Sequence, residues 1–304
     1  MQQDRLINRI VCSLCLLLVI ISVLACNANK ASSTPGWEMH WSDEFDGATN
    51  SPLDKANWLY DTGTSYPNGP AHWGTGEVQS YSESTENVYQ DGNGNLAIKA
   101  IHTGSAPTTG WSSGRIETVR SDFQPPAGKA MAVEARIQLP DVSGTAAQGY
   151  WPAFWMLGAP FRGNYWNWPG IGEFDILENI NGQNTWYGTL HCGVNPGGPC
   201  RETNGIGANA SAISPTLQSA YHVYRFEFDK SVTPQQLRWY VDGVQRHTVN
   251  ANQMDATTWD NATNHGFFIL LNLAIGGGWP GAPTNKTASG KVMLVDYVRV
   301  YYSR

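Results

Sequence analysis

Three acidic residues interrupt one short apolar stretch of the chain, Gly172-Glu173-Phe174-Asp175-Ile176-Leu177-Glu178-Asn179. The other residues of the stretch favour a β-strand, in which side chains alternate between the two faces. Glu173 and Asp175 therefore share one face, and Phe174 and Ile176 point into the layer behind it. Isolated charges are costly to bury, so the acidic face must serve a purpose.

Glu178 breaks this alternation. It lies an odd number of residues after Glu173, so a regular strand would turn it toward the core. A β-bulge adds one residue to a strand and re-aims the side chains that follow. We place such a bulge at Ile176-Leu177, which returns Glu178 to the acidic face. The alternative interpretation is a charged edge strand that resists aggregation.

Two carboxyls that face one groove, one ionised and one protonated, are the groups that hydrolyse glycosidic bonds. The run Glu-Phe-Asp-Ile-Leu-Glu resembles the E-x-D-x-x-E signature of glycoside hydrolase family 16, in the bulge-containing branch of laminarinases, agarases and carrageenases. The resemblance implies that Glu173 is the nucleophile, Asp175 its helper and Glu178 the acid/base. Further matching pieces, such as Trp41–Asp46, extend it from about Trp37 to the C-terminus.

The resemblance implies an all-β fold, a β-jelly-roll sandwich of two curved antiparallel sheets with a concave substrate cleft. The composition agrees, because 13 Trp and 32 Gly suit a sandwich with many turns and an aromatic groove. Hairpins are expected at Asp91–Gly94 and Asp242-Gly243. The expected strands are Trp37–Asp46, Asn87–Tyr89, Asn95–Ala100, Met131–Leu139, Tyr150–Leu157, Thr185–His191, Tyr221–Asp229, Gln236–Val241, Gln245–Val249, Phe267–Ile275 and Lys291–Tyr302.

Aromatic residues are expected along the cleft. The resemblance places Trp151 and Trp155 there, where their rings would stack on the C–H faces of sugars. Core packing is the alternative for both. His191 is expected to hydrogen-bond near the nucleophile, with a purely structural histidine as the alternative. The remaining expected substrate-binding residues are Glu77, Arg115 and Trp279.

The substrate is expected to be a polysaccharide. Trp151–Met156 and Asn272–Pro280 look most like laminarinases, which implies endo-hydrolysis of β-1,3- or mixed β-1,3/1,4-glucan with retention. The closed loop Cys192–Cys200 is unusual and keeps β-1,3-galactan or another galactan as an alternative. Two further candidate functions are a non-catalytic glycan-binding jelly roll and a transglycosylase. The chain carries a net charge of −6 without a Lys/Arg run, which argues against nucleic acid as a partner, and a monomer is expected.

The N-terminal residues have the pattern of an export signal. Arg5 and Arg9 precede the apolar run Ile10–Ala25, which predicts a signal peptide over residues 1–25. The run ends in Val23-Leu24-Ala25-Cys26, which resembles a lipobox, so Cys26 is the candidate lipid anchor. Residues 26–36 are then a tether and 37–304 the catalytic domain. The alternatives are a secretory signal cut slightly later and, less favoured because the run is short, a membrane span.

Cys192 and Cys200 lie close together across a Pro/Gly-rich loop. In an oxidising compartment they are expected to form a disulfide. A metal site with His191 is the weaker alternative, because a fourth ligand at the usual spacing is lacking.

The resemblance implies no cofactor for catalysis but a structural calcium ion. Its ligands would be the carboxylates of Glu44 and Asp296 and the carbonyl of Gly92 or Gly94. Oxygen ligands of this kind suit calcium. The alternative is that Glu44 and Asp296 serve only surface charge or hydrogen bonding.

Overall fold

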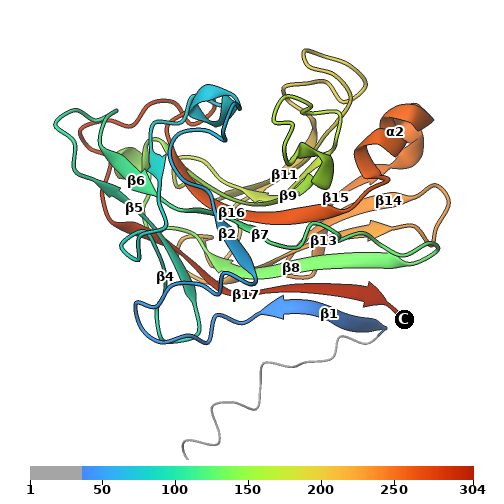
Figure 1. Cartoon of the computed structure of the whole chain (residues 1–304), viewed down its shortest axis with the longest axis horizontal. Coiled ribbons are helices and arrows are strands. Elements are labelled where there is room, and N and C mark those ends of the chain that lie inside the picture. Colours follow the sequence, from blue (N-terminus) through green and yellow to red (C-terminus); the bar gives the residue numbers. More distant parts are fainter. Residues whose placement is uncertain (1–35) are drawn as a thin grey trace, which may run out of the picture. The chain divides into compact units, whose positions relative to one another are not determined.

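Two antiparallel β-sheets dominate the part of the chain that the computed structural model describes, residues 36–304. Residues 39–304 form one compact unit, in which the sheets pack as a β-jelly-roll sandwich (Figure 1). The predicted signal peptide and Cys26 lie outside the described residues, as does all of the tether except residue 36. No helix between residues 36 and 304 is long and apolar enough to cross a membrane.

The first sheet has seven strands among the described residues, and the acidic strand β10 is one of its inner strands. In order across the sheet its strands are β12 (Ile206–Ser211), β11 (Thr185–His191), β10 (Glu173–Glu178), β9 (Tyr150–Gly158), β16 (Phe267–Ile275), β7 (Arg115–Thr118) and β2 (Trp58–Tyr60). Long loops gather on the side of this sheet that faces away from the other sheet (Figure 1).

The second sheet has ten strands in the described part of the chain. Its order is β15 (Val244–Asn250), β14 (Gln236–Val241), β13 (His222–Asp229), β8 (Ala130–Gln138), β17 (Lys291–Ser303), β5 (Leu96–His102), β6 (Trp111–Ser113) and β3 (Ser80–Tyr81). In addition β1 (Trp37–Asp43) pairs with β17, and β4 (Val88–Gln90) pairs with β5. Only the short pair β3–β6 is parallel among the described ladders.

Short helical turns complete the described residues. The 3₁₀ turns are η1 (Ala71–Gly74), η2 (Gly144–Ala147), η3 (Ala159–Phe161) and η4 (Ala251–Gln253). One α-helix, α2 (Ala256–Thr263), begins after Asp255, whose side chain accepts a hydrogen bond of 2.9 Å from the backbone N–H of Thr258. This helix was not predicted, although an N-cap aspartate is a recognisable signal for a helix start.

The hydrophobic core lies between the sheets, and β10 contributes its apolar face to it. Phe174 stacks on Phe226 of β13 and on Phe267 of β16, with ring centroids 4.8 and 4.5 Å apart. All three side chains are fully buried. Burying one phenylalanine in this way contributes about 1.5–3 kcal/mol. The core therefore fixes which face of β10 is left for the acidic side chains.

Each predicted strand is confirmed in place, with ends that differ by up to three residues, and the described residues contain further, mostly short strands. The first strand ends at Asp43 rather than Asp46, because Phe45 has a φ of 51° and turns the chain away. The hairpin at Asp242-Gly243 is confirmed, since both residues have positive φ and Val241 pairs with Val244. Strand β12 was missed, because its small and polar residues lack a strand pattern.

Candidate active site

The acidic strand contains the predicted bulge. Against β11, Asp175 pairs with Thr189 but Glu178 pairs with Tyr187, so two residues of β10 oppose one of β11. The register against β9 shifts at the same place, between Asp175 and Leu177. Both bulge residues, Ile176 and Leu177, are buried in the core. Glu173, Asp175 and Glu178 consequently all face the same side of the sheet.

Two buried tryptophans donate hydrogen bonds to backbone carbonyl groups at the bulge, where the hydrogen bonds between strands are disrupted. The indole N–H of Trp186 donates to the carbonyl of Ile176, and that of Trp239 donates to the carbonyl of Asp175, both at 2.8 Å. Gly188 of β11 lies opposite the bulge and makes room for these rings. A Cβ at this position would collide with the Trp186 ring and lie 2.9 Å from Cδ1 of Trp239.

We expect Trp186→Phe and Trp239→Phe each to lower the free energy of unfolding by about 1–3 kcal/mol, because a buried carbonyl loses its donor. Each should also lower kcat, since the bulge aims Glu178. Trp58→Phe is the matched control: Trp58 is equally buried, and its indole donates to Asp43 at 2.8 Å, away from the bulge. Urea unfolding and initial rates are measured together. Equal kcat in all three variants would contradict the role of the indoles.

A cavity of about 910 Å³ lies along the face of the first sheet that is turned away from the core. The three carboxylates of β10 reach it from the floor. Every residue that the sequence assigned to catalysis or substrate binding lines this cavity: Glu77, Arg115, Trp151, Trp155, Glu173, Asp175, Glu178, His191 and Trp279.

Aromatic rings form much of the cavity wall. Trp151 meets Trp279 edge to face at 5.8 Å, and Trp279 meets Tyr187 in the same way at 4.9 Å. Trp279 is 42% exposed, so much of its ring is available to a ligand. Trp155 donates its indole N–H to Asn272 at 2.8 Å, which fixes its plane. These rings and polar groups suit the stacking and hydrogen bonding that bind a sugar chain.

Sequence reasoning missed several cavity residues. Tyr187 could have been found, because alternation along β11 puts it on the same face as His191. Tyr66 and Trp73 come from loops, whose course the sequence does not reveal. Trp168, in the loop before β10, lines the cavity, whereas its neighbour Trp166 is 69% exposed and does not.

Arg115 lies in the cavity wall, but its guanidinium is already bound by neighbouring side chains. Its Nε lies 2.8 Å from Oδ2 of Asp61, and Nη2 donates to the hydroxyl of Tyr66 at 3.0 Å. Its guanidinium also lies over the rings of Trp73 and Trp155, at 4.6 and 4.9 Å from their centroids. The buried ion pair neutralises this cation, so its main effect is to hold aromatic rings in place.

Glu77 is also held within the protein. Its Oε1 accepts from the hydroxyl of Thr75 at 2.8 Å. Its Oε2 accepts from the side-chain amide of Gln79 at 2.6 Å and the hydroxyl of Tyr81 at 2.8 Å. With both oxygens engaged, Glu77 organises one edge of the cavity.

Glu178 has the environment of a carboxylic acid. Burial, together with the negative charge of Asp175, raises the pKa of Glu178 to about 8, although the Trp151 hydrogen bond and His191 oppose the rise. Trp151 donates its indole N–H to Oε1 of Glu178 at 2.8 Å, which leaves Oε2 to carry a proton. Glu178 is therefore protonated at neutral pH and can act as a proton donor.

Glu173 belongs to the same coupled group. Burial raises the pKa of Glu173 well above its ordinary value, and the charges of Asp175 and Glu178 add to this, while His191 opposes it. Glutamates whose charges affect each other titrate as a pair rather than singly. The pair retains a proton near neutral pH. Glu173 can attack as a carboxylate when that proton resides on Glu178.

His191 lies between two acidic groups. Its Nε2 is 3.2 Å from Oδ2 of Asp175, and its Nδ1 is 2.7 Å from Oε2 of Glu202. Single ligand atoms of Glu173, Asp175 and His191 lie within 4.8 Å of one another, a spacing that could also hold a cation. We interpret the group as ion pairs rather than a metal site, because the imidazole already supplies the positive charge.

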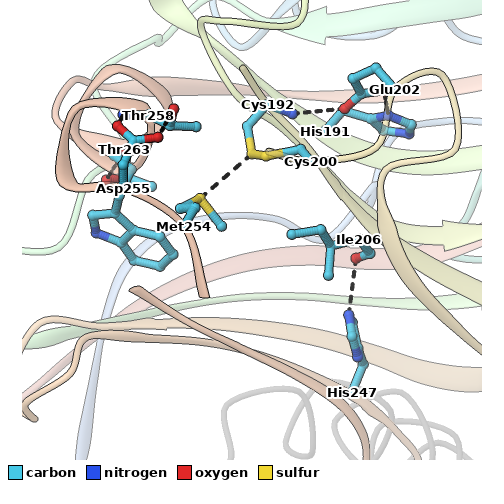
Figure 2. Close-up of a disulfide and its surroundings, with 11 residues drawn as sticks. His191, Cys192, Cys200, Glu202, Ile206, His247, Met254, Asp255, Thr258 and Thr263 are labelled. Carbon is cyan, nitrogen blue, oxygen red and sulfur yellow. Dashed lines mark hydrogen bonds and ion pairs between the residues drawn. A yellow bond between two sulfur atoms is a disulfide. The ribbon is translucent and has the colours of Figure 1, made fainter. Parts of the chain in front are cut away.

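Cys192 and Cys200 form the predicted disulfide, shown in Figure 2. Both are fully buried, and Sγ of Cys192 lies 3.7 Å from the sulfur of Met254. The disulfide closes the loop that follows directly on His191. The predicted pairing is therefore confirmed, and no thiol of this pair is available for the alternative metal site.

The expected calcium ligands lie away from the cavity and face arginines. Both oxygens of Glu44 accept hydrogen bonds from Arg299, at 2.8 and 2.7 Å. Asp296 lies 2.8 Å from Nη1 of Arg136. Both carboxylates are thus paired with a guanidinium, so a calcium ion would have to compete with an arginine at each of them.

Comparison with known protein families identifies one matching domain. Residues 136–221, which include β10 and β11, match the family model described as an XgeA-like, catalytic GH16 domain. GH16 denotes glycoside hydrolase family 16.

Curated relatives match along most of the chain. A β-glucanase of Rhodothermus marinus is 31% identical over 302 residues, which cover 94% of this chain and 92% of that protein. The glucan endo-1,3-β-glucosidase A1 of Niallia circulans is 35% identical over 282 residues, or 88% of this chain. This chain spans only 38% of the length of the Niallia protein.

Solved structures share the fold. An endo-1,3-β-glucanase from Streptomyces sioyaensis is 56% identical, with a TM-score of 0.88 over 90% of this chain and 99% of that one. The laminarinase catalytic domain of Thermotoga maritima is 30% identical, with a TM-score of 0.70 over 87% of this chain.

Proposed function

The chain belongs to glycoside hydrolase family 16, and from this premise we propose that it is a retaining endo-β-1,3-glucanase. The observation that carries the proposal is the bulge in β10, which brings Glu178 to the same cavity wall as Glu173 and Asp175. Glycoside hydrolysis uses two carboxyl groups that face one substrate groove, and this arrangement supports that role. The names of the relatives support β-1,3-glucan as the substrate.

The reaction proceeds in two displacements. In the first, a carboxylate oxygen of Glu173 bonds to the anomeric carbon, the glycosidic bond breaks, and Glu178 gives its proton to the leaving oxygen. In the second, Glu178 removes a proton from water, and the water oxygen displaces Glu173 from the same carbon. Asp175 lies between the two glutamates and balances the charge of His191. The two inversions together retain the anomeric configuration.

The cavity supports a neutral glycan as substrate. Its wall carries Trp151, Trp155, Tyr187 and Trp279, whose rings can stack on glucose units. The guanidinium of Arg115 is already paired with Asp61, so it is a poor partner for the sulfate groups of carrageenan. The proposal includes mixed β-1,3/1,4-glucan as a substrate, because this polymer also contains β-1,3-linked glucose units that can reach the carboxylates.

A panel of polysaccharides tests the proposal. Laminarin, mixed β-1,3/1,4-glucan, β-1,3-galactan, agar and carrageenan are each incubated with the protein, and the products are sized. We expect short and intermediate oligosaccharides from the glucans from the first minutes, with proton NMR showing newly formed β-anomers. Preferred cleavage of galactan would show that galactan, not glucan, is the substrate. If no glycan yields new reducing ends, the protein is a glycan-binding module and not a hydrolase.

Catalysis in this family needs no cofactor, since the carboxylates perform the bond making and breaking. A structural calcium ion stays a prediction from the family resemblance, and the arginines that face Glu44 and Asp296 argue against it. We therefore expect that chelation with EGTA followed by added calcium leaves the melting temperature unchanged in calorimetry. A calcium-dependent rise that Glu44→Gln abolishes would restore the calcium prediction.

The proposal extends to export of the protein. The apolar N-terminal run supports a signal peptide, and the buried disulfide supports an oxidising compartment. Cys26 would then carry a lipid anchor, residues 26–36 would form the tether, and residues 37–304 the catalytic domain, acting as a monomer. Cys26→Ser should release the protein from the membrane fraction, which cell fractionation measures.

A further inference from the structure

We propose that Glu202 is a positioning residue that holds His191 in its doubly protonated form beside Glu173 and Asp175, and that the disulfide-closed loop serves to deliver it. This inference rests on the proposed function, because it concerns how the same carboxylates are kept in a reactive state. Glu202 is not part of the cavity wall, so it acts through His191 and not on the substrate.

The carboxylate of Glu202 uses both of its oxygens. Oε1 accepts the backbone N–H of Cys192 at 2.9 Å, and Oε2 lies 2.7 Å from Nδ1 of His191. Its side chain is fully buried. A buried carboxylate is stable only when it is paired, and the backbone N–H supplies no positive charge. His191 is therefore the cation that pairs with Glu202; the two lie beside each other in Figure 2.

The loop holds Glu202 rigidly at this place. The disulfide ties Cys200, two residues before Glu202, to Cys192, the residue after His191. Gly197 and Glu202 also exchange two backbone hydrogen bonds of 2.6 Å. Because these constraints surround both ends of the contact, the carboxylate cannot swing away from the imidazole without opening the loop.

The protonation state of His191 follows from its two nitrogens. Nδ1 faces the Glu202 carboxylate and Nε2 faces the Asp175 carboxylate, 3.2 Å away. A carboxylate is an acceptor only, whereas a neutral imidazole offers one N–H and one lone pair. The Glu202 contact is a hydrogen bond, whereas Oδ2 of Asp175 meets Nε2 as a close ion pair without a hydrogen bond. A lone pair on Nε2 would be repelled by the Asp175 carboxylate, so the geometry points to a positively charged His191.

The acidic groups around His191 come from two segments. Glu173 and Asp175 belong to β10, and Glu202 to the loop after β11, while Glu178 acts from farther along β10. Burial on its own would lower the pKa of His191, but the nearby carboxylates of Asp175 and Glu202 and the charge of Glu173 raise it well above its ordinary value. In return the positive charge of His191 opposes the rise in the pKa of Glu173.

Glu202→Gln tests the proposal with almost no change of shape. The glutamine carbonyl can still accept from Cys192, while its amide N–H donates to Nδ1 of His191, which stabilises the neutral ring protonated on Nε2. Nitrogen-15 NMR of labelled histidine follows the titration, with His191→Gln to assign the signal. Glu202→Asp restores the charge, and Glu86→Gln removes an exposed charge of the same kind as a control.

We expect the wild-type His191 to titrate well above the ordinary range of histidine. In Glu202→Gln its midpoint should fall by about 1–3 pH units. Above the new midpoint kcat should fall about tenfold per pH unit, because Glu173 then loses its cationic neighbour, and KM should change little. Glu202→Asp should move both the midpoint and the pH–rate profile back toward wild type, and Glu86→Gln should leave both unchanged.

Either of two results would overturn the proposal. One is a wild-type His191 that titrates at or below about 6.5, the ordinary value for histidine. The other is a Glu202→Gln variant with the wild-type midpoint and pH–rate profile, even if its melting temperature is lower, since that describes a purely structural residue. A wild-type protein that cleaves no glucan would instead contradict the proposed function. The NMR titration would then still decide whether Glu202 holds His191 protonated.

Discussion

Glu173→Ala is expected to lower kcat on laminarin by about 10⁴-fold or more, because the variant lacks the carboxylate proposed to attack the anomeric carbon. The fold should survive, since Glu173 is only partly buried and faces the cavity, not the core. Circular dichroism and the melting temperature check the fold, and reducing-end assays measure the rate.

Azide distinguishes the nucleophile from a merely nearby acid. In Glu173→Ala, azide can enter the space left by the carboxylate and attack from the same side, which gives a glycosyl azide of α configuration from an activated β-glucoside. In Glu178→Ala, Glu173 still forms the covalent intermediate, and azide then gives the β product. NMR of the two products reports the configuration. The opposite pairing of variants and products would reverse the roles of Glu173 and Glu178.

Glu178→Gln should lower kcat by about 10²–10⁴-fold for substrates with a poor leaving group, because the proton donor is lost. An aryl glycoside with an acidic phenol needs no proton and should be affected much less in the first step. The alkaline limb of the wild-type pH–rate profile should fall near pH 8, where Glu178 loses its proton, and should disappear in the variant. An equal loss of kcat in the variant for both types of substrate would exclude Glu178 as the acid.

The same substitution should change stability with a definite sign. The pKa of Glu178 is raised to about 8 in the folded protein from 4.5, so its contribution to stability is complete below pH 4.5 and is lost as the pH rises through 8. Glu178→Gln cannot ionise and avoids that loss. We expect its melting temperature to match wild type near pH 4.5 and to exceed it by a few degrees near pH 9, as scanning calorimetry can show.

Local sequence patterns predicted the elements that present the site. Alternation along Glu173–Glu178 identified the acidic and apolar faces, and the odd spacing of Glu178 required the bulge that β10 contains. The two-residue turn at Asp242-Gly243 and the disulfide across eight residues are likewise short-range features. Such features depend on neighbours in the sequence, so the sequence carries them directly.

Most strands, the bulge and the shared face of the three carboxylates follow from the sequence, because each depends on side-chain periodicity within a few residues. The partners of the charged side chains follow only from the folded chain. Arg115 pairs with Asp61 across 54 residues, and Glu44 pairs with Arg299 across 255. Even Glu202, only 11 residues from His191, reaches it through the course of a loop. Long-range ion pairs and indole hydrogen bonds depend on how sheets and loops meet in space, and no local pattern encodes that meeting.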